Sequence, residues 1–131
     1  MSFLKNIFST SKDENQSKQP SKVKWIALTD LGQLNDIQNI SEKPVLLFKH
    51  STSCSISRMA LKNFENEFDL HEKIDTYFLD LLNFRTISNE IASKFGVVHQ
   101  SPQILLIKNG VSIYDSSHDR IDAKELEKFL N

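Results

Sequence analysis

Residues 45–57 read VLLFKHSTSCSIS, and this stretch decides the fold that the sequence predicts. Its first four residues form a continuous apolar run, which is typical of a β-strand covered on both faces. The residues that follow the cysteine place apolar side chains at helical spacing. Cys54 is therefore predicted to lie where a buried strand ends and a helix begins.

Cys54 is the only cysteine of the chain and the residue to which the sequence assigns reactivity. At a helix N-terminus the unpaired backbone N–H groups and the positive end of the helix dipole favour an anion. Cysteines in such positions react as thiolates. A buried structural cysteine is the commonest alternative, but the polar residues on both sides of Cys54 argue against it. We therefore expect a reactive thiol.

Ser57 stands three residues after Cys54, where a dithiol enzyme carries its second cysteine. A lone thiol cannot form an intramolecular disulfide, so any disulfide of Cys54 joins it to another molecule. We expect the Ser57 hydroxyl to donate a hydrogen bond to the thiolate without being able to resolve a disulfide. The single cysteine also fits a reducing compartment.

Composition excludes several other functions. The chain has 131 residues and a formal net charge of −1, which gives no electrostatic case for a nucleic-acid or anionic-membrane partner. The first apolar residues are interrupted by Lys5 and Asn6, which leaves too short a run for a signal peptide or a membrane span. One cysteine and scattered histidines give no metal-ligand pattern. We expect a soluble cytoplasmic protein without a metal site.

The chain divides into a tail and one domain. Residues 9–22 are nearly all polar and cannot bury enough apolar surface to offset the entropy of ordering. We expect residues 1–22 to be a disordered tail and residues 23–131 to be one folded domain, which is long enough for a sizeable core.

Strand and helix patterns alternate along the domain. Strands are expected at 25–28, 45–48, 74–81, 103–107 and 111–114, with Asn109-Gly110 as a hairpin turn. Thr29 is expected to cap the first helix, Gly96 to end the third, and Asp122 with Glu125 to form a capping box on the last. The order β-α-β-α-β-α-β-β-α predicts an α/β protein with a mixed central sheet and helices on both faces.

Two details of this pattern bear on the site. The helix after Cys54 is expected to turn one apolar face to the core, comprising Ile56, Met59, Ala60, Phe64 and Phe68. Lys49 and His50 precede the cysteine loop, and strand alternation lets only one of them face the site. We expect solvent to cover at least one of the two.

The element order resembles the thioredoxin fold, with Pro102 placed 48 residues after Cys54 (102 − 54 = 48). In thioredoxin-like proteins a proline at this place is cis and stands against the reactive sulfur, so we expect a cis Ser101–Pro102 bond. The segments KPVLLFKHST (residues 43–52) and SCSIS (53–57) resemble the signature of the YtxJ family of bacterial monothiol bacilliredoxins. Trp25 and Ser101-Pro102-Gln103 agree with that family.

The resemblance implies a chemistry that the residues permit. The Cys54 thiolate would attack the mixed disulfide between a client protein and bacillithiol, a small cysteine-containing sugar thiol. The partners would be S-thiolated client proteins and a low-molecular-weight thiol, acting on a monomer with no resident cofactor. Ser101 and Pro102, with the residues that flank the cysteine, would shape the client site; the flanking residues are Thr52, Ser53 and Ser55.

Two alternatives remain at this stage. Cys-Ser-Ile-Ser shares the cysteine-to-serine pattern of monothiol glutaredoxins, some of which hold an iron–sulfur cluster between two subunits. A thioredoxin-like module that binds partners without catalysis would need no reactive thiol. A four-residue pattern does not decide among these functions.

Overall fold

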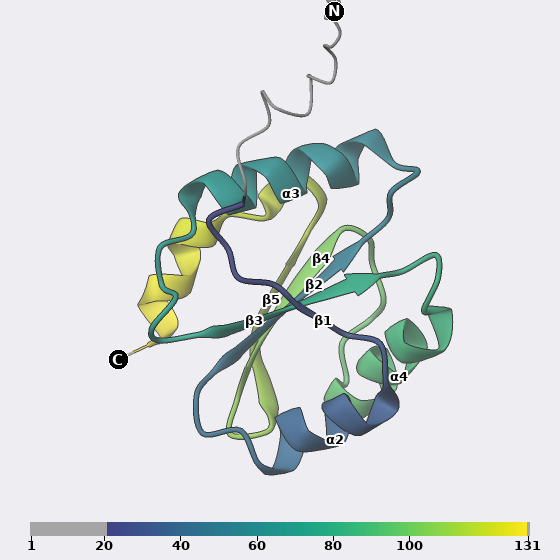
Figure 1. The fold of residues 1–131 in the computed structure, drawn as a ribbon, viewed down its shortest axis with the longest axis vertical. Helices are drawn as coiled ribbons and strands as arrows, with labels where there is room; N and C mark the ends of the chain where they lie inside the picture. Colours follow the sequence, from purple (N-terminus) through teal and green to yellow (C-terminus); the bar gives the residue numbers. More distant parts are fainter. Residues whose placement is uncertain (1–20, 131) are drawn as a thin grey trace, which may run out of the picture.

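A five-stranded mixed sheet forms the centre of the molecule (Figure 1). The structure is a computed structural model that describes residues 21–130, so the expected disordered tail falls almost entirely outside the described residues. The strand order is β1-β3-β2-β4-β5, and β2 is parallel to β3 and antiparallel to β4. The strands are β1 (Ile26–Ala27), β2 (Val45–His50), β3 (Asp75–Asp80), β4 (Gln103–Lys108) and β5 (Val111–Ser117).

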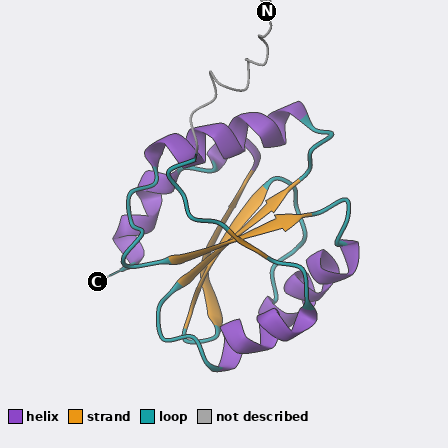
Figure 2. Cartoon of the chain, in the orientation of Figure 1, coloured by secondary structure: helices purple, strands orange, loops and turns teal. Residues whose placement is uncertain are grey.

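Helices cover both faces of the sheet, as the sequence predicted (Figure 2). Helices α2 (Leu31–Asn39) and α4 (Arg85–Phe95) pack on one face. Helix α3 (Ser55–Glu67) and the 3₁₀ helix η2 (Ala123–Phe129) pack on the other. Strand β2 is buried along its whole length and supplies alternate side chains to the two cores. Its continuous apolar run is explained by this central position.

The turns predicted from single residues are confirmed. Asn109 and Gly110 both have positive φ, 54° and 79°, as a two-residue hairpin turn between antiparallel strands requires. Gly96 ends α4 in the left-handed conformation at φ 67°. The Ser101–Pro102 peptide bond is cis.

Several predicted boundaries and caps are wrong. Strand β1 has two residues in place of four, and β5 continues to Ser117, with a register shift between Leu106 and Ile107 of β4. The cap of α2 is Asp30 and not Thr29: its carboxylate accepts the Gly32 N–H at 2.7 Å, and the Gln33 side chain completes a capping box. Capping propensity alone does not decide between the adjacent Thr29 and Asp30. Gln33, three residues after Asp30, identifies Asp30 as the cap.

The last helix also departs from its prediction, because it is 3₁₀ throughout. Asp122 caps it as expected by accepting the Lys124 N–H at 2.9 Å. Glu125, however, accepts a hydrogen bond from Lys128 at 2.8 Å in place of returning to the cap.

The predicted inward face of helix α3 is confirmed for Ala60, Phe64 and Phe68 but wrong for Ile56 and Met59. Ile56 and Met59 are 56% and 66% exposed, whereas Ser57, Ala60 and Phe64 are buried. Both sets have helical spacing, and the buried set begins with a serine, which an apolar periodicity cannot identify. The helix is therefore rotated so that Ser57 points to the end of β2, which sets the geometry of the site.

Candidate active site

Cys54 is the N-cap of α3 and lies four residues beyond the end of β2, as predicted. Its backbone is extended, at φ −113° and ψ 122°, and its carbonyl accepts the Arg58 N–H at 3.1 Å, the first hydrogen bond of the helix. The Cys54 side chain makes no capping hydrogen bond and is partly exposed. The partly exposed cysteine thus lies at the positive end of the α3 dipole, which favours its thiolate.

A short hydrogen-bonded chain fixes the loop that carries Cys54. The Ser57 side chain is fully buried, and its Oγ accepts the Ser51 N–H at 3.0 Å. The same Oγ lies 2.8 Å from Nδ1 of His50, the last residue of β2. These contacts join the strand end, the loop and the first turn of α3. The Ser57 hydroxyl was predicted to donate a hydrogen bond to the Cys54 thiolate. Its partners in the structure are Ser51 and His50, and the bond to the thiolate stays a prediction.

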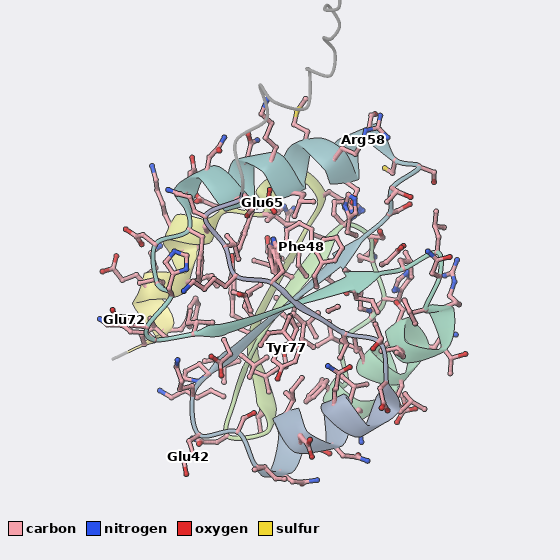
Figure 3. All side chains as sticks on the ribbon, viewed as in Figure 1. Glu42, Phe48, Arg58, Glu65, Glu72 and Tyr77 are labelled. Carbon is pink, nitrogen blue, oxygen red and sulfur yellow. The ribbon has the colours of Figure 1, made fainter. Side chains whose placement is uncertain are left out.

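His50 is buried at 4% exposure, so the expectation that solvent covers His50 or Lys49 is wrong for both residues. The His50 ring packs near Phe48 and Phe78, with centroid distances of 6.5 and 5.4 Å. Burial lowers the pKa of His50 below its usual 6.5, and the charges of Asp80 and Glu65 act in the opposite direction. Neutral imidazole therefore predominates at neutral pH. Figure 3 shows Phe48 between α3 and the sheet, with Glu65 on α3 above it.

Lys49 is completely buried and packs toward the other face of the sheet. Its Nζ lies 3.1 Å from Nδ1 of His99, which is also 3.3 Å from Oγ of Ser88 on α4. Burial lowers the pKa of Lys49 to about 8. Burial and the nearby cations Lys49 and Arg85 lower the pKa of His99. No sequence pattern indicated this cluster, because a lysine ordinarily lies at the surface.

The cis-proline turn lies beside the end of β2. Gln103 pairs with Lys49 in the β2–β4 register, so Pro102 comes opposite the strand end from which the Cys54 loop departs. Pro102 is buried, and its carbonyl accepts the His118 N–H at 3.0 Å. The Ser101 Oγ is buried and has no hydrogen-bond partner. A buried polar atom without a hydrogen-bond partner therefore lies next to the cis-proline.

The three polar residues beside Cys54 are all exposed. The Thr52 carbonyl accepts a hydrogen bond from the Arg58 guanidinium at 2.9 Å, and the Ser53 Oγ lies 3.2 Å from that of Ser51. Arg58 is at the N-terminal end of α3 (Figure 3). The structure thus gathers Thr52, Ser53 and Ser55 around the cysteine, and the first two also help to hold the loop.

A groove of about 510 Å³ begins at Ser55, the residue after Cys54, and it was not predicted from the sequence. Ser55, Ile56 and Met59 of α3 form one side. His118, Asp119 and Ile121, in and after the 3₁₀ helix η1 (His118–Arg120), form the other. The missed signal was Ile56 and Met59 themselves, which the helical period had assigned to the core. Their exposure makes an apolar surface on the first turns of α3.

The described part of the chain contains no cluster of three or more His, Cys, Asp or Glu side chains suited to hold a metal ion. Within residues 21–130, no helix is long and apolar enough to cross a membrane.

The central sheet, the cysteine at the start of α3 and the cis-proline turn define a thioredoxin-fold protein. A solved structure provisionally named as an oxidoreductase with a thioredoxin fold is 31% identical, with a TM-score of 0.68 over 79% of this chain and 90% of the other. A thioredoxin of Malassezia sympodialis is 17% identical, with a TM-score of 0.65 over 86% and 93%. Mitochondrial thioredoxin 3 of Saccharomyces cerevisiae is 19% identical, with a TM-score of 0.62 over 81% and 92%. The last two show the fold alone.

The family follows from the sequence match over residues 26–126, which fits the model of the monothiol bacilliredoxin BrxC. The chain therefore belongs to the monothiol bacilliredoxin family. Its function is thiol–disulfide redox chemistry. The family resemblance and the thioredoxin fold predicted from the sequence are confirmed.

Proposed function

We propose that this protein removes a low-molecular-weight thiol, such as bacillithiol, from mixed disulfides of client proteins through Cys54. The observation that carries the proposal is a partly exposed cysteine at the start of α3, with a buried serine at the position of a resolving cysteine. The family match supports monothiol chemistry. The identity of the small thiol rests on the family description, because no residue of the site specifies a sugar.

The exchange needs two displacements at sulfur. In the first, the Cys54 thiolate attacks the sulfur of the small thiol, the client–small-thiol bond breaks, and the client leaves as a thiolate that takes a proton from water. Cys54 now carries the small thiol as a mixed disulfide. In the second, another small-thiol molecule, as its thiolate, attacks this adduct and releases Cys54, forming the symmetric small-thiol disulfide. Each step breaks one disulfide bond and forms another, so no outside oxidant or reductant is needed. Ser57 forms no bond in either step.

The client would lie across Cys54 between two surfaces. The apolar groove formed by Ile56 and Met59 would take apolar side chains next to the modified client cysteine. On the cis-proline side, the turn formed by Ser101 and Pro102 would border the small thiol or the client backbone. We propose that the protein acts as a cytoplasmic monomer with no resident cofactor.

The test is an exchange assay with a model protein that carries bacillithiol on one cysteine. Wild-type protein should release the reduced client and gain the mass of one bacillithiol, and Cys54→Ser should leave the client untouched. Ser93→Ala is the matched control, because it removes an exposed hydroxyl of α4, on the opposite face of the sheet from α3, and leaves the thiol and its loop in place. Release of the client by Cys54→Ser would refute the proposal, since the chain has no other thiol.

Two further outcomes separate the parts of the proposal. Equal or faster release from a glutathionylated client would keep the exchange step and overturn the bacillithiol assignment. An iron-containing, coloured dimer on anaerobic purification, with no exchange activity, would favour the iron–sulfur carrier and overturn the proposal.

A further inference from the structure

Three buried polar side chains contact the loop of residues 97–102, which connects α4 to β4 (Figure 1). They are Lys49 of β2, Ser88 of α4 and Gln103 of β4, each at most 1% exposed. Buried polar groups are costly unless they are hydrogen-bonded, and each of the three finds a partner in this loop. Side chains of three different elements therefore hold the loop, and the exchange steps use none of them.

Gln103 holds the loop at two backbone groups. Its Nε2 donates to the Val98 carbonyl at 3.0 Å, and its Oε1 accepts the Gln100 N–H at 3.4 Å. The same Nε2 lies 3.5 Å from the Ser117 Oγ at the end of β5. Because Gln103 is only 1% exposed, water has little access to these contacts. One buried side chain thus joins the loop to the strand that precedes η1.

Lys49 holds the same loop at its middle. Its Nζ lies 3.1 Å from Nδ1 of His99, the residue between Val98 and Gln100. Lys49 and Gln103 are directly opposite each other in the β2–β4 register, and such cross-strand pairs share one face of the sheet. The two side chains therefore act from one face on three consecutive residues of the loop.

The loop connects two borders of the region where the client is proposed to lie. It ends in Ser101 and Pro102, opposite the strand end from which the Cys54 loop departs. The Pro102 carbonyl accepts the His118 N–H at 3.0 Å, and His118 forms part of the wall of the apolar groove. A shift of the loop would therefore move both the turn that ends in Pro102 and the groove wall.

We propose that Gln103 and Lys49 are positioning residues that preorganise this loop for the client. They act through the loop backbone and through His99, and they take no part in the displacements at sulfur. A loop that is already ordered loses less conformational freedom when the client binds, so the two residues should lower the client KM without changing kcat. The inference rests on the proposed function in that the client is a protein mixed disulfide.

The first test needs no client. It compares amide hydrogen exchange of the loop in the wild type and in Gln103→Met, which keeps the side-chain length and removes both amide contacts. Protection of the Gln100 N–H should fall about ten-fold, as expected for the loss of one hydrogen bond. Gly110→Ala is the matched control, because it should destabilise the same two strands at the hairpin, the end of β4 opposite Gln103. Loops open locally, so the control should leave Gln100 protection within about two-fold.

The second test measures kcat and KM for the bacillithiolated client, with the rate of Cys54 alkylation by iodoacetamide as a readout of the sulfur itself. In Gln103→Met the client KM should rise about five-fold, the size expected when client binding must also order the loop, while kcat and the alkylation rate stay within about two-fold. Lys49→Met removes a fully buried charge and should be at least as stable as the wild type, yet it should also raise KM. Gly110→Ala should leave KM unchanged.

Three results would overturn the inference. One is unchanged Gln100 protection and client KM in Gln103→Met, and another is an alkylation rate that falls as far as kcat/KM. The third is a KM that follows the stability of the variants, rising in Gly110→Ala and not in Lys49→Met. If Gln103→Met does not fold, as judged by thermal unfolding, the KM and loop exchange of Lys49→Met decide alone. A wild type without exchange activity would refute the proposed function, and amide protection would still decide whether Gln103 holds the loop.

Discussion

Replacing Lys49 by methionine should stabilise the protein at neutral pH. Lys49 is completely buried, and its pKa is lowered to about 8 from 10.5 by burial. At roughly 1.4 kcal/mol per pH unit, this difference corresponds to about 3 kcal/mol that the folded state loses by holding a protonated Lys49 below pH 8. Methionine removes that cost at similar length and gives up the hydrogen bond to His99, worth about 1 kcal/mol. In this variant His99 still has the Ser88 Oγ, 3.3 Å from its Nδ1, as a hydrogen-bond partner.

The expected gain in the free energy of unfolding at pH 7 is therefore about 2 kcal/mol. The unfolded chain keeps its Lys49 proton up to about pH 10.5, and the folded chain loses it near pH 8, so wild-type stability rises relative to Lys49→Met between these values. Urea denaturation at intervals from pH 7 to 10 measures this difference, with Lys62→Met, at an exposed position of α3, as the control. A destabilised Lys49→Met at pH 7, or a difference that stays constant with pH, would refute the reasoning.

Two further predictions concern the hairpin turn and position 57. Gly110→Ala should destabilise the fold by about 1–3 kcal/mol in urea, because φ is +79° and a Cβ would lie 2.5 Å from the Gln38 carbonyl oxygen. Gly96→Ala has a similar φ of +67° and no atom within 4 Å of the new Cβ, so a loss as large as that of Gly110→Ala would contradict the role of the clash. Ser57→Cys should form an internal disulfide with Cys54 under mild oxidation, seen as a loss of two hydrogens by mass, because residues three apart share a helix face. A persistent small-thiol adduct on Cys54 of that variant, with no internal disulfide, would count against this geometry.

The turns and the central strand were predicted correctly because their residue types are typical of one particular structure. Gly96 and the Asn109-Gly110 pair marked a helix end and a turn because few residues adopt positive φ. Val45 to Phe48 marked the central strand because an unbroken apolar run needs cover on both faces. Cys54 and Pro102 could be placed in the site from their positions relative to these elements.

The prediction failed where a polar side chain is buried by partners distant in the sequence. Solvent was expected at Lys49 or His50, and Ser57 was expected to serve the Cys54 thiolate. All three are instead buried, and their hydrogen-bond partners are brought to them by the fold. The same limit explains the error at Ile56 and Met59. Once Ser57 takes the inward face of α3, these two apolar residues must lie on the outward side, which forms the groove.

The intact mass of the protein isolated from its own cells, after brief exposure to a thiol-specific oxidant, tests the central claim most directly. The account predicts a single adduct with the mass of one low-molecular-weight thiol, located on the peptide that contains Cys54 and absent after reduction. The mass of that adduct identifies the small thiol. Clients that carry the small thiol while Cys54 remains unmodified throughout their recovery would contradict the account.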